Sequence, residues 1–278
     1  MLARVRTSAP LLLQLAQMSS APSPNVEINP NVHERAVMHT SAMEWRPSPD
    51  PRVWRRRVYL RGTDVEGSHV SGVVRFEPGS SFHSHPHPRG EEILVLSGVF
   101  SDQRGDHGAG SFLLNPEGFE HAPHSEQGCE LFVRLRQYAG HDRPQLAIHT
   151  DQLPWLPSEH AGVAFKQLFA DERWPDVATL QRYELACVLL CVCSTAADDR
   201  HRFSHSLAHS WEPGTQLPPA QLSKSREVFV VDGAWSDEQH ERYTSGSWLR
   251  LPAGSVFGGS SECGCTLFVH DGLNEANH

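Results

Sequence analysis

The chain has 278 residues, of which 38% are hydrophobic and 21% charged, so it can bury a core and is not a disordered protein. Its formal net charge of −9 argues against nucleic acid or an anionic membrane as a partner. No apolar run approaches the ~20 residues of a membrane-spanning helix. The 18 histidines are many for this length, so their positions are the features to follow.

The N-terminal segment has the composition of a targeting sequence. Its first 20 residues contain two arginines, several Ser and Thr residues and no acid, and Leu and Ala recur at loose helical spacing. This is typical of an organelle transit peptide, with a disordered tail or a start at Met18 as the alternatives. We treat residues 1–42 as a leader or flexible tail, which leaves the cytoplasm and the mitochondrion as predicted locations.

The rest of the chain contains an internal duplication. Residues 76–102 match residues 211–237, and residues 110–133 match residues 246–269 with one further residue inserted between. Both copies read as short β segments separated by Gly and Pro turns, such as Asn-Pro-Glu-Gly at 115–118. We therefore expect an all-β protein built from two tandem barrels, repeat one over residues 43–145 and repeat two over residues 146–278.

Repeat two holds a segment without a counterpart in repeat one. Residues 184–210 separate a strand-like segment from the Trp-Glu-Pro-Gly motif that should follow it. A genuine insertion and a gene-model artefact both explain this segment, so we assign no function to its histidines and cysteines. The C-x-C pairs, Cys191/Cys193 and Cys263/Cys265, could bind a soft metal, but structural thiols are favoured.

One constellation in repeat one carries metal chemistry. His85 and His87 stand two apart on an extended segment, so both side chains point to one face. Glu91 follows after a short loop, and His121 arrives from a later strand. Three neutral imidazoles and one carboxylate form a site for one divalent transition metal. This donor set suits Fe(II), Zn(II), Mn(II), Ni(II) or Cu(II), and it leaves open positions for a substrate.

Repeat two serves as an internal control for this prediction. The four positions are occupied there by residues that bind no cation: Ala220, Leu222, Arg226 and Phe257. The surrounding Gly, Pro and Cys positions keep their residue types, so the four candidate ligands were lost together. We therefore predict that repeat two is a degenerate barrel without metal.

The same comparison assigns roles to neighbouring residues. Glu92 persists in repeat two as Glu227, so it is predicted to be structural, while Glu91 is the ligand. Cys129 persists as Cys265 and is predicted to lie in the core. His83 is predicted to lie in a loop, and His107 and His124 are predicted to lie at the surface or at the rim of the site.

The spacing resembles the two-part signature of the cupin family. Residues 85–98, HPHPRGEEILVLSG, and residues 128–133, GCELFV, resemble especially the ChrR-type cupins. The resemblance covers roughly residues 43–138 and, more weakly, 150–271. It implies two double-stranded β-helix (jelly-roll) barrels, a bicupin, with His85, His87, Glu91 and His121 as metal ligands. One departure is Ser125, where the family often has Asn.

The resemblance implies three kinds of function. Small cupins of this type include dioxygenases that cleave C–C bonds next to carbonyls, so our first hypothesis is a metal-dependent dioxygenase acting on a small carbonyl or hydroxyaryl compound. The alternatives are a non-enzymatic metal-dependent sensor of a ligand or oxidant, as in ChrR, and a Zn or Mn isomerase or lyase. In each case the partner is a small molecule, no catalytic side chain beyond the ligands is predicted, and a homo-oligomer is compatible with the fold.

Overall fold

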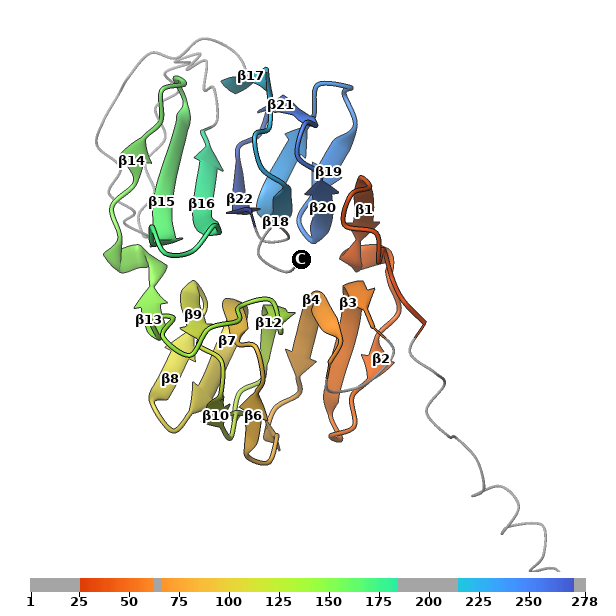
Figure 1. Cartoon of the computed structure of the whole chain (residues 1–278), viewed down its shortest axis with the longest axis vertical. Helices are drawn as coiled ribbons and strands as arrows, with labels where there is room; N and C mark the ends of the chain where they lie inside the picture. The colour runs from red at the N-terminus through yellow and green to blue at the C-terminus, as the bar shows by residue number, and fades with distance from the viewer. Residues whose placement is uncertain (1–25, 63–66, 185–214, 273–278) are drawn as a thin grey trace, which may run out of the picture.

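The computed structural model describes residues 26–62, 67–184 and 215–272, which form two β-barrels stacked on one another (Figure 1). Within these ranges there is no α-helix, only the 3-10 turns η2 (Thr40–Ala42) and η3 (Thr150–Gln152). No helix in the described ranges is long and apolar enough to cross a membrane. The prediction of an all-β protein with two tandem barrels is confirmed. The transit-like segment and almost all of the atypical insertion lie outside the described residues.

Barrel one contains a large antiparallel sheet in the order β13-β9-β7-β12-β4-β3-β2, with β5, β8 and β11 attached, and a separate β6–β10 pair. Its strands are β2 (Arg46–Pro47), β3 (Val53–Arg61), β4 (His69–Phe76), β5 (Ser80–Ser81), β6 (His85–His87), β7 (Glu91–Asp102), β8 (Gly105–Gly108), β9 (Ser111–Asn115), β10 (Phe119–His121), β11 (His124–Ser125), β12 (Cys129–Leu135) and β13 (Leu146–His149).

Barrel two repeats this plan in the order β1-β20-β18-β22-β16-β15-β14, with β17, β19 and β21 attached. Its strands are β1 (Ala36–His39), β14 (Leu156–Pro157), β15 (Val163–Ala170), β16 (Val177–Tyr183), β17 (Thr215–Gln221), β18 (Arg226–Ser236), β19 (Arg242–Thr244), β20 (Ser247–Leu251), β21 (Val256–Ser261) and β22 (Cys265–Asp271).

The two repeats exchange their first strands. Strand β1 lies in the segment that the sequence assigned to a leader, yet it pairs with β20 of barrel two. Strand β13, the counterpart of β1 at the start of repeat two, pairs with β9 of barrel one. Figure 1 shows both exchanges at opposite sides of the molecule. Barrel two therefore includes a strand that precedes residue 43, and barrel one includes the first strand after residue 145.

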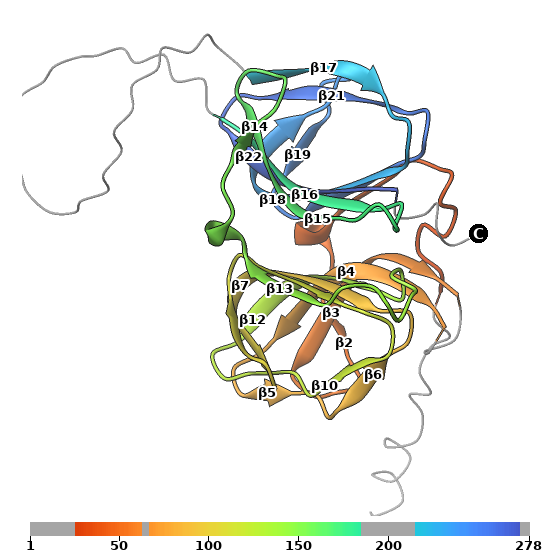
Figure 2. The same ribbon diagram turned by 60° about the vertical axis from the view of Figure 1, so that its left-hand side comes forward.

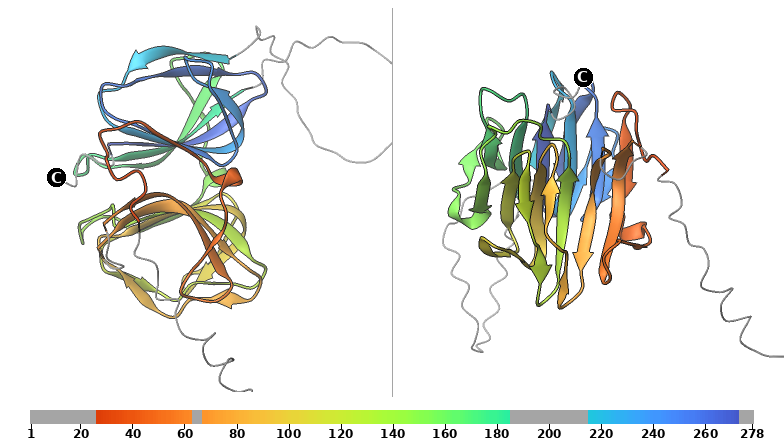
Figure 3. Two further views of the ribbon diagram at one scale, coloured as in Figure 1. Left: turned by 90° about the vertical axis from the view of Figure 1, so that its right-hand side faces the viewer. Right: turned by 60° about the horizontal axis from the view of Figure 1, so that its bottom comes forward.

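The large sheets of the two barrels face each other across an apolar core. The left view of Figure 3 shows the barrels as two rings that meet along one side. Phe132 of barrel one stacks on Phe229 of barrel two with ring centroids 4.4 Å apart, and Phe268 completes an aromatic cluster. Because these rings are buried, the contact between the barrels is a continuation of the hydrophobic core rather than a surface contact.

Residues along β7 alternate between this contact and the barrel interior. Ile93 and Val95 belong to the interior cluster of barrel one, while Leu94 packs in the core between the barrels. Because successive residues on a strand point to opposite faces, Glu91 points into the barrel and Glu92 points to barrel two. There Glu92 meets the buried side chains of Arg134 and His270, at 2.6 Å and 3.2 Å. Glu92 therefore joins the two barrels.

Candidate metal centre

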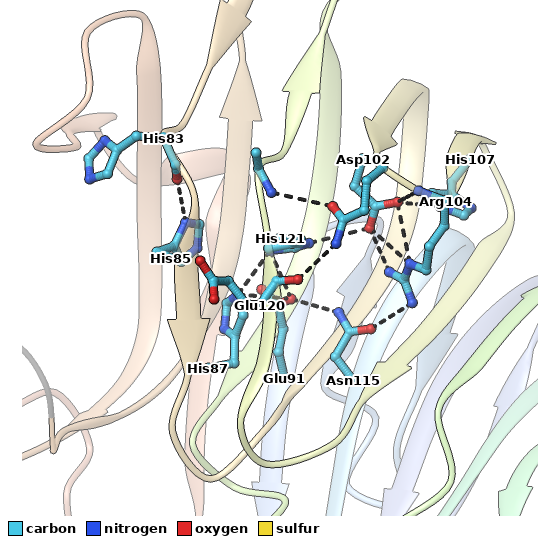
Figure 4. A network of polar contacts seen from close by, with 12 residues as sticks. His83, His85, His87, Glu91, Asp102, Arg104, His107, Asn115, Glu120 and His121 are labelled. Carbon is cyan, nitrogen blue, oxygen red and sulfur yellow. Dashed lines mark hydrogen bonds and ion pairs between the residues drawn. The ribbon is translucent and has the colours of Figure 1, made fainter.

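The β6–β10 pair brings three histidines together inside barrel one. In its register His121 lies opposite His85, and Phe119 lies opposite His87. One ring nitrogen from each of His85, His87 and His121 lies within 4.8 Å of the other two. His87 and His121 are 6% and 2% exposed, so this cluster is closed to bulk water on most sides. Figure 4 shows the three imidazoles turned toward one another.

The spacing of the nitrogens suits a shared cation. Nε2 of His87 and Nε2 of His121 are 2.9 Å apart. Two nitrogens that bind one ion at about 2.1 Å and at a right angle lie about 3.0 Å apart. Nδ1 of His85 is 2.9 Å from the carbonyl oxygen of His83, so a proton on Nδ1 donates to that oxygen and leaves Nε2 as the lone-pair nitrogen. The three histidines could hold a metal ion.

The Glu91 carboxylate lies beside the histidine cluster. Its Oε2 is 3.5 Å from Nε2 of His87 and 3.6 Å from Nε2 of His121. Burial leaves the residue only 5% exposed, and the amide of Asn115 donates to Oε2 at 2.9 Å. A negative carboxylate next to three imidazoles supplies the charge that a divalent cation needs in a low-dielectric site.

A ring of hydrogen bonds links His121 to Glu91 through residues that the sequence analysis did not identify. Nδ1 of His121 donates to Asp102 at 3.4 Å, and Arg104 donates to the same carboxylate at 2.6 Å. Arg104 also donates to Oδ1 of Asn115 at 3.0 Å, and Asn115 donates to Glu91. Figure 4 shows this ring beside the cluster. Such outer contacts fix the orientation of metal-binding side chains.

Burial and charge set the protonation of the cluster. Burial, together with the charges of His121 and His85, lowers the pKa of His87 to about 4, although Glu91 opposes the shift. His87 is therefore neutral at physiological pH, the form that can bind a metal. Burial alone would raise the pKa of Asp102, but hydrogen bonds from His107, His121 and Arg104 hold it far below its usual range.

The structure also locates the histidines and the cysteine near the cluster for which the sequence made predictions. The side chain of His83 is 82% exposed and lies near Asp50, as expected for a loop residue. Cys129 is 4% exposed in the core of barrel one. His124 is partly buried on β11. The side chain of His107, expected at the surface or the rim of the site, is 12% exposed, and its Nε2 lies 3.5 Å from Asp102.

Barrel two fills the corresponding space with packed side chains. Ala220 lies opposite Phe257 in the β17–β21 register, as His85 lies opposite His121 in barrel one. Arg226 binds Asp271 at 2.7 Å and lies over the ring of Phe257. The ring of Phe257 stacks on Trp235 with centroids 5.2 Å apart. Aromatic packing thus replaces the candidate metal site in this barrel.

Two members of this ring of hydrogen bonds, Arg104 and Asn115, could have been found by comparing the two repeats. Asn115 corresponds to Leu251, and the turn that matches Arg104, residues 237–241, has no arginine. Asp102 persists as Asp237, which accepts from the hydroxyl of Tyr243 at 2.8 Å instead. The sequence signal was therefore the loss of Asn and Arg together with the four candidate ligands.

The fold is shared with solved structures of low sequence identity. The chain superposes on a "putative dioxygenase" from Nostoc punctiforme with a TM-score of 0.61 and 15% identity, covering 86% of this chain and 82% of that one. A "putative glyoxylate induced protein" from Pseudomonas aeruginosa gives a TM-score of 0.61 and 12% identity, with 86% and 90% covered. A variant of oxalate decarboxylase from Bacillus subtilis gives 0.53 and 10%, with 85% and 77% covered. At these identities the likeness shows the fold alone.

The sequence itself places the chain in a family. Comparison with curated proteins gives no match. The profile of the ChrR Cupin-like domain matches residues 33–139 and again residues 197–274, about two thirds of the chain in total. The two matches fall on the two repeats, in agreement with two stacked jelly-roll barrels. The chain therefore belongs to the ChrR Cupin-like domain family, as a tandem member with two cupin barrels.

Proposed function

We propose that barrel one binds one divalent transition-metal ion through His85, His87, Glu91 and His121, and that the protein is a metal-dependent enzyme of the dioxygenase type. Its substrate in this proposal is a small carbonyl or hydroxyaryl compound. The observation that supports it most is the convergence of three imidazole nitrogens within 4.8 Å, with a carboxylate oxygen 3.5 Å away. Fe(II) is the ion we expect, because this donor set suits it and leaves coordination positions open.

The residues around the cluster have definable tasks in this reaction. When bound, Fe(II) supplies Lewis acidity and one-electron chemistry that no side chain provides. Asp102 keeps the proton of His121 on Nδ1, so Nε2 stays free for the ion. Asn115 fixes the orientation of the Glu91 carboxylate. These contacts hold the donor atoms in place before a substrate arrives, so little reorganisation is needed on binding.

Aromatic rings limit access of water to the cluster. The ring of Phe82 lies 5.7 Å from His85, and the rings of Phe100 and Phe119 lie 6.0 Å and 5.5 Å from His121. A dry, apolar wall strengthens the electrostatic interactions inside the site and protects reactive species from hydrolysis. A compact carbonyl compound fits such surroundings beside the cluster.

The first test is metal content after anaerobic purification. We expect about one Fe per chain in the wild-type protein, as four protein ligands would hold one ion. His121→Ala should lose it. His83→Ala is the matched control, because it removes an exposed imidazole two residues from His85 and should keep the metal. A wild-type protein that retains no Fe, Zn, Mn or Ni after incubation with each ion would refute the proposal.

The second test separates redox chemistry from other uses of the ion. The Fe(II) protein should consume O2 with a member of a panel of β-diketones and hydroxyaryl ketones, while the Zn(II) protein should not. Absence of O2 uptake with every compound would reject the dioxygenase assignment. Isolation with Zn, and turnover of a substrate without O2, would point to an isomerase or lyase instead.

A further inference from the structure

A group of arginines lines barrel one opposite the histidine cluster. On β3, Arg55 pairs with Val74 and Arg57 pairs with Gly72. Paired residues of an antiparallel sheet point to the same face, and Val53 and Val74 pack in or against the interior cluster. Arg55 and Arg57 therefore point into the barrel. Figure 2 shows that β6 lies across the barrel from β3 and β4.

A third arginine stands next to Glu91. Arg136 follows directly after β12, and its backbone N–H donates to the carbonyl oxygen of Gly90 at 2.8 Å. Its φ of 64° is in the left-handed region, where a side chain costs free energy. In repeat two the same position is Gly272, with a φ of 74°. Strain of this kind is kept where the side chain is needed. The Nε of Arg136 donates to the carbonyl oxygen of Ser68, which fixes the guanidinium in place.

The charges of these arginines act on one another. Burial, followed by the charges of Arg57 and Arg136, lowers the pKa of Arg55 to about 10, and Asp50 opposes the shift. The side chain of Arg55 forms no hydrogen bond or ion pair with the described residues. The charge of Arg136 also acts on His87. A largely buried guanidinium that faces two others is stabilised by an anion entering the same space.

Repeat two lacks all three arginines. The register of β15 with β16 places Phe165 at the position of Arg55 and Gln167 at the position of Arg57. With Gly272 in place of Arg136, the basic wall disappears in the same barrel that lacks the candidate metal ligands. An arginine that only stabilised the barrel would not be expected to be absent from the same repeat as the candidate metal ligands.

We propose that the arginine wall, Arg55 with Arg57 and Arg136, binds a carboxylate of the substrate, so that barrel one acts on a small anionic carbonyl compound. The planar fork of a guanidinium matches the two oxygens of a carboxylate. The carbonyl end of the compound then faces the histidine cluster, and this part of the inference rests on the proposed metal site. The wall itself is defined by residues outside that site.

The test uses two diketones that differ in one group. Acetylacetone is neutral, and 2,4-dioxopentanoate carries a carboxylate in place of one methyl. Calorimetric titration of the Zn(II) protein measures both affinities without turnover. We expect the carboxylate to bind at least about tenfold more tightly, as one charge-assisted hydrogen-bonded pair provides. Equal affinities, or tighter binding of a phosphate monoester of similar size, would overturn the proposal.

Substitutions test whether the arginine wall causes the tighter binding of the carboxylate. Arg55→Phe introduces the residue of repeat two and should weaken the carboxylate far more than acetylacetone, while Arg55→Lys keeps part of the preference. Arg57→Gln, again the residue of repeat two, gives an independent reading if Arg55→Phe does not fold. If a folded Arg55→Phe protein keeps the full preference for the carboxylate, the assignment is refuted. If Arg55→Phe does not fold, the same result with Arg57→Gln refutes it.

The same titrations distinguish this inference from the proposed metal site. If the metal site is wrong and the wall is right, the wild-type protein holds no ion and still binds 2,4-dioxopentanoate in an Arg55-dependent manner. If the metal site is right and the wall is wrong, the protein holds its ion and binds both diketones equally. Each result rejects one claim and leaves the other standing.

Discussion

Replacing Arg134 by leucine should destabilise the whole protein, because this arginine balances two buried carboxylates between the barrels. Its guanidinium is 0% exposed and lies 2.6 Å from Glu92 and 3.2 Å from Glu227. Removing one partner of a buried ion pair costs about 3–5 kcal/mol. Two carboxylates lose their partner here, so we expect a loss of at least about 4 kcal/mol of unfolding free energy at neutral pH.

The loss should depend on pH with a defined sign. Burial alone would raise the pKa of Glu92, but the charges of His270 and Arg134 lower it in the folded wild-type protein. Its contribution to stability is therefore present above the unfolded pKa of about 4.3 and is lost as pH falls through the folded pKa. In the variant, Glu92 without Arg134 becomes easier to protonate, so the penalty shrinks on acidification. The gap between the two proteins should narrow from pH 7 to pH 5.

Urea unfolding followed by tryptophan fluorescence measures this gap. With a slope of about 3 kcal/mol per molar urea, the expected loss moves the midpoint by about 1.3 M. Arg134→Met combined with Glu92→Gln and Glu227→Gln is the matched control, because it removes the arginine and both charges together and should recover most of the loss. A midpoint shift below about 0.3 M for Arg134→Leu, or an equal gap at both pH values, would refute the reasoning.

Three further predictions concern the two barrels separately. Asn115→Leu should weaken metal binding about 10- to 100-fold, because Glu91 loses the amide that orients it. Competition with a chromophoric chelator measures this, and an unchanged affinity would exclude a positioning role. Phe257→Ala should cost about 3–5 kcal/mol of unfolding free energy, because its ring is buried against Trp235. A loss below about 1 kcal/mol would show that barrel two is not packed around this ring. Burial, followed by neighbouring arginine charges, lowers the pKa of His69 to about 4. Unfolded His69 binds a proton below about pH 6.5, so stability should fall between pH 6.5 and 4. Thermal melts of His69→Gln should show a smaller fall, and an equal fall contradicts the assignment.

The barrels and the histidine cluster could be predicted because their signals are local or repeated. Two histidines at i and i+2 share one face of any extended segment, and Glu91 and Glu92 must point to opposite faces. The duplication then separated residues that serve the barrel from residues that serve the site. Neither step requires knowledge of the tertiary structure. Both predicted that His85, His87 and His121 lie together, as they do in the structure.

The contact of Asp102 with His121 and the strand exchange could not be predicted because they depend on long-range pairing. Asp102 persists in repeat two as Asp237, so its hydrogen bond to His121 left no mark in the comparison. The segment containing β1 reads like the end of a leader, and only its register with β20 reveals a structural role. The contact between Nε2 of His107 and Asp102 likewise joins two strands that pair only in the folded protein.

The contacts of barrel two with barrel one explain why a repeat without the candidate ligands was retained. The large sheet of barrel one carries an apolar face that includes Phe132 and Leu94, and barrel two covers it. Without that cover the charges of Glu92 and Arg134 would lose the partners that balance them at the contact. Barrel two also provides the partner strand for β1 and contributes β13 to barrel one. Inside, the stack of Phe257 on Trp235 fills the volume that an ion and its ligands would occupy. The second barrel could therefore lose the candidate ligands, but its outer surface had to be kept.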